Sequence, residues 1–299
     1  MIIKQDLHIH THCSCDGANL HLPEIIKGCQ ELGFEHFGLA DHLHTAFNMP
    51  DIEISKKEYD EYGPVKGFHF GIEVTCATQW ECEMIAKREF ASCFTCQVLG
   101  KPFQTMTPID GIMFGGPAGG PLQVDLTKED IQRLGIQYVI GGVHKPNYSE
   151  LTFSAILEDW YNQSCFLVNN PLVDILAHPW EMIPFWSSDN IVNRNNSQDF
   201  ELYLKIPQEY WDNLGDLIVK NKKLAEINPA IIFRDIIPEK VRYAVIEKMA
   251  AWKEKNVKFT FGSDSHCKYD VENIIKYDKV LSEFGFKESD FDLPKGLKK

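Results

Sequence analysis

The chain has 299 residues, of which 44% are hydrophobic and 24% are charged, values ordinary for a folded globular protein. Its net charge of −13 and the absence of a Lys/Arg-rich stretch argue against a nucleic-acid partner. No apolar run reaches the roughly 18 residues that span a bilayer, the first residues lack a signal-peptide layout, and the cysteines are scattered, so we expect a cytoplasmic protein with reduced thiols and no membrane partner.

Seven short segments rich in Val, Ile, Leu and Phe end in polar residues and are followed by helical patterns. They are residues 2–10, 34–42, 68–74, 138–144, 173–178, 223–228 and 257–264. Helices fit between them: residues 23–32 begin with Pro and stop before Gly33, and residues 238–255 carry an apolar stripe at helical spacing. This rhythm of repeated β-α units predicts an α/β fold with a parallel barrel.

The interval between the third and fourth predicted strands is the longest, so we expect an insertion at about residues 75–137. It could be a lid-like excursion or one more β-α unit, with a strand at residues 122–126. The glycine-rich residues 115–120 lack a phosphate-loop pattern and are interpreted as a flexible turn, with closure over a substrate as the alternative. A structural zinc site or redox pair formed by Cys76, Cys82, Cys93 and Cys96 stays open, although a lone Cys-x-x-Cys is a weak signal.

Histidines gather at the carboxyl ends of the predicted strands, which meet at one face of a parallel barrel. Six of the eleven lie there: His8, His10, His42, His144, His178 and His266. Three carboxylates join them: Asp16, Glu73 and Asp264. One histidine at such a place is ordinary, but the whole set predicts a site for Zn, Mn or Fe ions. Glu73 could bridge two ions, and a metal-activated hydroxide would then serve as nucleophile without a serine or cysteine.

Other polar residues have less defined meanings. His12 and His44 follow the candidate ligands by two residues and could support them, donate a proton to a leaving group, or be solvated. Lys145 could meet a phosphate oxygen or be solvated. The remaining histidines and three nearby cysteines are assigned no chemistry: His21, His36, His69, Cys13, Cys15 and Cys267.

The motifs resemble those of the PHP family, named for polymerase and histidinol phosphatase, along the whole chain. The matching segments are His8-Ile9-His10-Thr11 through Ser14 and Asp16-Gly17, Ala40-Asp41-His42, Gly71-Ile72-Glu73, Gly142-Val143-His144, Ala177-His178-Pro179, Glu226-Ile227-Asn228 and Gly262-Ser263-Asp264-Ser265-His266. The resemblance implies a distorted, TIM-like (β/α)7 barrel, expected here as one domain over residues 1–299.

The resemblance also implies three divalent metal ions. The first would be held by His8, His10, Glu73 and Asp264, the second by Glu73, His144 and His178, and the third by Asp16, His42 and His266. His12, His44 and Asp41 are the candidate catalytic residues.

The first hypothesis for function is hydrolysis of a small-molecule phosphomonoester, with in-line attack on phosphorus and His12 or His44 protonating the departing alkoxide. One alternative is amidohydrolase-like cleavage of a C–N or ester bond. Glu73 argues against it, because that class usually carries a modified lysine at the matching place. The other alternative is a non-catalytic module that binds metal or a phosphorylated ligand, which the complete ligand set disfavours.

Overall fold

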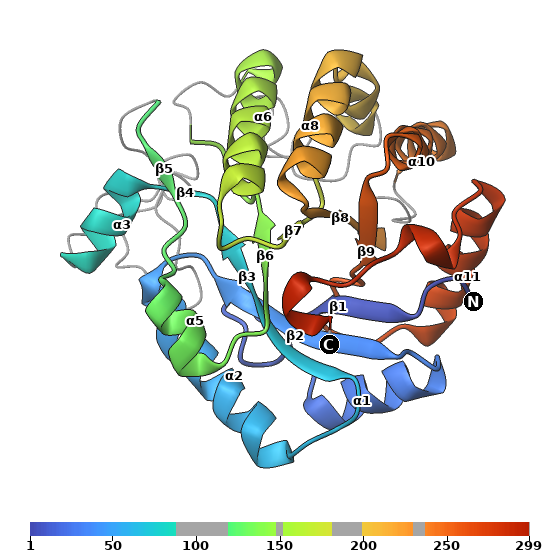
Figure 1. Ribbon diagram of the computed structural model, residues 1–299. Coiled ribbons are helices and arrows are strands. Elements are labelled where there is room, and N and C mark those ends of the chain that lie inside the picture. The colour runs from blue at the N-terminus through green and yellow to red at the C-terminus, as the bar shows by residue number, and fades with distance from the viewer. Residues whose placement is uncertain (88–118, 148–151, 181–198, 230–236, 299) are drawn as a thin grey trace.

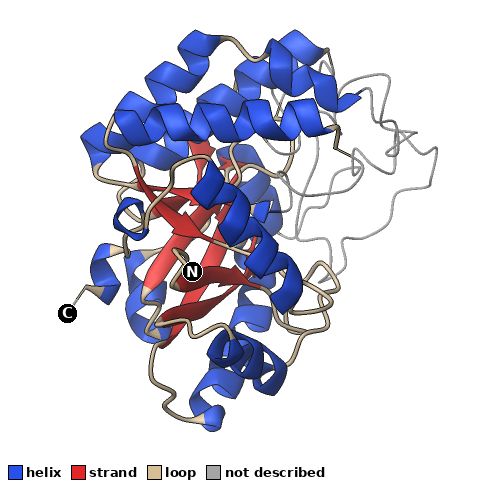
Figure 2. Ribbon diagram, turned by 90° about the vertical axis from the view of Figure 1, so that its right-hand side faces the viewer, coloured by secondary structure: helices blue, strands red, loops and turns tan. Residues whose placement is uncertain are grey.

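A parallel sheet of seven strands lies in the middle of the molecule with helices around it (Figures 1 and 2). The computed structural model describes residues 1–87, 119–147, 152–180, 199–229 and 237–298. The strands, in sheet order, are β1 (Gln5–Ile9), β2 (His36–Leu43), β3 (Phe68–Thr75), β6 (Tyr138–Gly142), β7 (Ile175–Leu176), β8 (Leu224–Ile227) and β9 (Lys258–Phe261). All seven strands predicted from the sequence are confirmed, each with somewhat different ends.

The two edges of this sheet meet just beyond β9. The amide of His10 donates to the carbonyl of Ser265 at 3.0 Å, and the amide of Asp264 donates to the carbonyl of His8 at 2.7 Å. The register of β1 against β2 shifts between Asp6 and Ile9. The sheet is therefore a distorted, nearly closed (β/α)7 barrel, as expected.

The helices form the outer layer. They are α1 (Leu22–Glu31), α2 (Met49–Tyr62), α5 (Lys128–Leu134), α6 (Phe153–Asn169), α8 (Gln208–Asn221), α10 (Glu239–Glu254) and α11 (Val271–Glu283), with short 3-10 turns η1 (Ala46–Asn48), η2 (Asp199–Lys205), η3 (Glu288–Asp290) and η4 (Lys295–Leu297). The apolar stripe predicted for residues 238–255 is buried, and the indole of Trp252 donates to the carbonyl of Trp211 at 2.7 Å. Within the described ranges, none of the helices is long and apolar enough to cross a membrane.

The predicted insertion contributes a separate two-stranded antiparallel ribbon, β4 (Ala77–Thr78) with β5 (Leu122–Gln123), and the short helix α3 (Gln79–Ala86). Residues 122–126 thus do include a strand, but it pairs with β4 and adds no unit to the barrel. Cys76 and Cys82 are buried free thiols. Cys93, Cys96 and residues 115–118 lie outside the described residues.

The amino-terminal half of the barrel interior is apolar. Tyr138, Ile140, Ile175 and Leu224 pack there, and Leu297 from η4 closes that end. The Tyr138 hydroxyl lies 2.8 Å from the carbonyl oxygens of Leu7 and Leu39. A side chain at Gly71 would collide with the Tyr138 ring, so glycine is needed there. Polar side chains are left to fill the opposite end of the barrel.

Candidate metal centre

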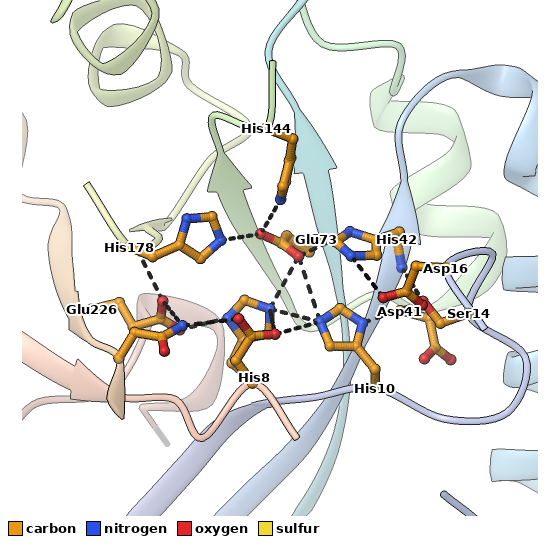
Figure 3. A network of polar contacts seen from close by, with 12 residues as sticks. His8, His10, Ser14, Asp16, Asp41, His42, Glu73, His144, His178 and Glu226 are labelled. Carbon is orange, nitrogen blue, oxygen red and sulfur yellow. Dashed lines mark hydrogen bonds and ion pairs between the residues drawn. The ribbon is translucent and has the colours of Figure 1, made fainter. Parts of the chain in front are cut away.

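Glu73 stands at the middle of the polar end of the barrel, with histidines from several segments pointing at its carboxylate (Figure 3). It is fully buried. One oxygen, Oε1, lies 3.0 Å from His144 Nε2 and 2.9 Å from His178 Nε2. The other, Oε2, lies 3.1 Å from His8 Nε2 and 3.0 Å from His42 Nδ1. One carboxylate is therefore shared by side chains from β1, β2 and the ends of β6 and β7.

The charge of Glu73 follows from these neighbours. Burial alone would raise the pKa of its carboxyl group, but the positive charges of His8, His144 and His42 outweigh this effect and hold the pKa well below its ordinary value. The low pKa favours the ionised form of this buried carboxylate, the form that can bind a cation.

Asp264 adds a second carboxylate from the turn after β9. Its Oδ1 lies 3.0 Å from His10 Nε2 and 3.6 Å from His8 Nε2. Asp264 adopts a left-handed backbone conformation with φ of 53°, which directs its side chain to the cluster instead of continuing the strand. The turn is held in place because the amide of Ser263 donates to Asp6 Oδ1 at 2.9 Å.

Asp16 supplies a third carboxylate, from the loop after β1. Its Oδ2 lies 3.6 Å from His42 Nε2 and forms an ion pair with His266 Nε2. The rings of His10 and His266 are 4.2 Å apart between centroids. Potential ligand atoms of His10, Asp16, His42 and His266 all lie within 4.8 Å of one another.

The structure therefore brings all the candidate ligands together in what we call the Glu73 cluster: His8, His10, Asp16, His42, Glu73, His144, His178, Asp264 and His266. Two smaller groups with ligand atoms within 4.8 Å also fall inside it, one of His8, His10 and Asp264 and one of His42, Glu73 and His144.

The cluster fits divalent cations better than it fits a hydrogen-bonded network. His8 Nε2 and His10 Nε2 face each other at 3.0 Å, although both nitrogens also point at carboxylates. His42 Nδ1 and His144 Nε2 lie 3.0 Å from Glu73 but are not aligned for a hydrogen bond with it. Imidazole nitrogens and carboxylate oxygens that converge in this way are the donors that Zn²⁺ and similar ions take in proteins.

Two residues that support the cluster had no assigned role in the sequence. Glu226 on β8 lies 2.6 Å from His8 Nδ1 through Oε1, and its Oε2 accepts from the amide of His178 at 3.0 Å. Thr75 Oγ1 lies 2.5 Å from His44 Nδ1 and 2.7 Å from His144 Nδ1. Glu226 had two sequence signals, its place in the matching segment Glu226-Ile227-Asn228 and its charge within the apolar strand Leu224–Ile227, but neither indicated what it contacts.

The three candidate catalytic residues lie in different surroundings. His12 is on the rim, with 31% of its side chain exposed and its Nε2 3.2 Å from Glu58 Oε1. His44 is buried and stacks on His42. Asp41 is buried, and its oxygens accept from the amide and hydroxyl of Thr11 and from the Ser55 hydroxyl. These contacts suit Asp41 to hold the loop after β1, and its catalytic role stays a prediction.

The other polar residues singled out by the sequence are also accounted for. Lys145 is buried and forms an ion pair with Glu81 of α3, so it is not the solvated lysine that one interpretation predicted. His36 Nδ1 lies 3.0 Å from His69 Nε2, and both residues are near the amino-terminal ends of their strands, away from the cluster. The ring of His21 contacts that of His12, with 4.2 Å between centroids and a tilt of 35° between the ring planes.

The fold and the cluster define a parallel α/β barrel protein with a histidine and carboxylate site at the carboxyl ends of its strands. The PHP domain family matches residues 6–230, and the chain belongs to that family. It has no match among curated proteins.

Two of the solved structures that share the fold carry histidinol phosphatase names. A histidinol phosphate phosphatase from Lactococcus lactis subsp. lactis Il1403, complexed with zinc, L-histidinol and phosphate, is 15% identical, with a TM-score of 0.58 over 97% of this chain and 99% of that chain. A protein from Listeria monocytogenes, provisionally assigned as a histidinol phosphatase, is 15% identical, with a TM-score of 0.55 over 92% of this chain and 99% of that chain.

Proposed function

We propose that this protein is a metal-dependent phosphoesterase that hydrolyses the phosphomonoester of a small molecule. The observation that carries the proposal is the fully buried carboxylate of Glu73, approached by histidines from four segments at the mouth of the barrel. Membership of the PHP family and the fold shared with an enzyme bound to zinc, L-histidinol and phosphate support it.

The proposed ligands divide into three sets around Glu73. The first is His8, His10, Glu73 and Asp264, the second is Glu73, His144 and His178, and the third is Asp16, His42 and His266. Bound divalent cations, which we propose to be three Zn, Mn or Fe ions, would neutralise phosphate oxygens and lower the pKa of a water molecule toward neutrality.

The other residues position the ligands and move a proton. Glu226 and Thr75 fix the rings of His8 and His144. His12 is the better placed of the two candidate acids, since it is partly exposed at the rim and Glu58 orients its ring, so it can reach the leaving alkoxide. His44 Nδ1 is engaged with Thr75, which suits it to hold His144 in place.

We also propose that residues 1–299 form a single barrel domain with an insertion near residues 75–137, and that the protein works in the cytoplasm. The free state of the seven cysteines in the described parts of the chain is compatible with a reducing compartment.

The test is to count metal ions per chain by elemental analysis and then screen phosphomonoesters, including L-histidinol phosphate, beside amide and lactone substrates. We expect release of inorganic phosphate that stops when the metal is removed and returns when it is added back. Cleavage of amides or lactones alone would establish the amidohydrolase alternative. A protein that holds metal but turns over neither class would establish the non-catalytic module.

A further inference from the structure

A second group of potential ligands lies on the rim of the barrel, outside the Glu73 cluster. It consists of His12 and Cys13, in the loop after β1, and Glu58 on α2. One ligand atom from each residue lies within 4.8 Å of the other two. We propose that His12, Cys13 and Glu58 bind one further divalent cation of the zinc class.

The distances suit a tetrahedral ion. With Zn–N and Zn–O distances of about 2.0–2.1 Å and Zn–S of about 2.3 Å, ligand atoms of one tetrahedral ion stand roughly 3.3–3.6 Å apart. His12 Nε2 lies 3.2 Å from Glu58 Oε1, and Cys13 Sγ lies 3.8 Å from His12 Nε2. These two distances differ from the tetrahedral values by only a few tenths of an ångström, and the third pair, Cys13 with Glu58, also lies within 4.8 Å, so the three side chains could fill three of the four positions.

The site is both ordered and accessible. The Cys13 amide donates to Thr11 Oγ1 at 3.1 Å, and Thr11 is in turn held by Asp41, so the loop keeps Cys13 in place. The exposed fractions of the His12 and Glu58 side chains are 31% and 36%, which leaves room for an ion to enter and for a water molecule to complete the tetrahedron. Because the loop already holds part of the binding geometry, a cation that binds here loses less free energy to the ordering of side chains.

The thiol distinguishes this site from a simple His12–Glu58 ion pair. Burial raises the pKa of Cys13 to about 11, so the free thiol is neutral near pH 7. Cation binding would replace the S–H bond with a bond from sulfur to the cation and release the proton to solvent. A set of one sulfur, one nitrogen and one oxygen selects borderline ions such as Zn²⁺ or Co²⁺ over Mg²⁺ or Ca²⁺.

A cation bound at this site should also affect catalysis. This effect rests on the proposed role of His12 as the acid, whereas the site itself does not. An ion on His12 Nε2 removes the nitrogen that would carry the proton to the leaving group. Zinc beyond the amount that fills the Glu73 cluster should therefore inhibit turnover, and Cys13→Ser should weaken that inhibition.

Cobalt titration of the full chain tests the site directly. The proposed ligands of the Glu73 cluster contain no sulfur, so a thiolate-to-Co²⁺ charge-transfer band reports a cysteine ligand elsewhere. We expect one equivalent of this band in the wild type, its loss in Cys13→Ser, and its retention in the control Cys165→Ser on α6 and in Cys93→Ser/Cys96→Ser. A band that survives in Cys13→Ser, that disappears with the Cys93 and Cys96 substitutions, or that never forms overturns the proposal.

Protection from alkylation tests the site in the unaltered protein, in case Cys13→Ser folds poorly. Peptide mass spectrometry would follow the reaction of Cys13 with iodoacetamide at mildly alkaline pH, with and without added zinc. We expect zinc to slow alkylation of Cys13 at least about ten-fold, because a metal-bound thiolate is withdrawn from reaction, and to leave Cys165 unaffected. An unchanged rate at Cys13 contradicts the site even if the protein is an active phosphatase.

Discussion

Glu226 and His8 form a buried pair, with Glu226 Oε1 2.6 Å from His8 Nδ1. A carboxylate can only accept a hydrogen bond, so Nδ1 of His8 donates its proton to Glu226, and a cation bound at Nε2 would replace the proton that Nε2 otherwise presents to Glu73. The second oxygen of Glu226 accepts from the backbone amide of His178 at 3.0 Å. One carboxylate thus sets the orientation of two proposed metal ligands without reaching the cations itself.

Glu226→Gln tests this role. The glutamine amide retains one oxygen but loses the charge and the second acceptor, so His8 is held less firmly in the tautomer that binds metal. We expect metal affinity to fall by about 10–100-fold with the fold intact, measured against a competing chelator. Glu254→Gln, which changes an exposed carboxylate on α10, is the matched control. Equal affinities in the two variants would exclude the orienting role of Glu226.

His178→Ala and Asp264→Ala test the ligands themselves. Both side chains point into the cluster and not into the apolar core, so each substitution should lower the metal content and reduce turnover by more than about 100-fold while far-ultraviolet circular dichroism stays unchanged. His36→Ala removes a histidine from the opposite end of the barrel and should keep metal and activity. Full turnover in metal-depleted His178→Ala would remove the proposed mechanism.

The barrel could be predicted from the sequence because each strand has a local signal, a short run of Val, Ile, Leu and Phe that ends in a polar residue. The residues at which the strands end could not be predicted in the same way. Residues 173–178 were predicted as a strand, but only Ile175–Leu176 pair in the sheet. His178 has φ of 25°, so the chain turns there to aim the imidazole at Glu73. Such a turn depends on the tertiary contacts of the side chain, and no local sequence pattern predicts it.

The same limit applies to the site. The metal ligands could be predicted because histidines and carboxylates recur at equivalent strand ends, whereas the partners of individual residues depend on contacts distant in sequence. Lys145 illustrates this: its partner Glu81 belongs to the insertion, 64 residues earlier. The sequence suggested that Lys145 contacts a phosphate or is solvated, and neither interpretation included a carboxylate from α3. The hydrogen bonds of Asp41 also join distant residues, Thr11, which is 30 positions away, and Ser55, which is 14 positions away, and no local pattern indicates them.

The buried pair of Lys145 and Glu81 leads to a prediction about stability. Removing one partner leaves the other charge buried, so Lys145→Met and Glu81→Gln should each lower the free energy of unfolding by about 3–5 kcal/mol. The double variant should lose less than the sum of the two, which denaturant titration of all three variants would measure. If Lys145 instead served the substrate phosphate, Lys145→Met would raise KM while stability stayed close to that of the wild type.

Asp6 makes the stability of the fold depend on pH. It is fully buried below the cluster, where its oxygens accept from the amide of Ser263 and the hydroxyl of Tyr269. Burial dominates these hydrogen bonds and raises the pKa of Asp6 from 3.8 to about 6. Between pH 3.8 and about 6, Asp6 keeps its proton in the folded protein but has released it in the unfolded chain. The contribution of Asp6 to stability is therefore greatest near pH 4 and is lost as the pH rises to about 6.

Asp6→Asn should remove this part of the pH dependence. The amide oxygen can still accept from Ser263, and the amide nitrogen can donate to Tyr269, so the variant should fold. A shift of about two pKa units corresponds to about 3 kcal/mol at most. Denaturant titrations from pH 4 to 7 should show the wild type losing up to this amount relative to the variant, with the change confined to pH 4–6. Titration of the Glu73 cluster is common to both proteins and cancels in the difference, so parallel curves would mean that Asp6 is ionised in the folded state throughout this range.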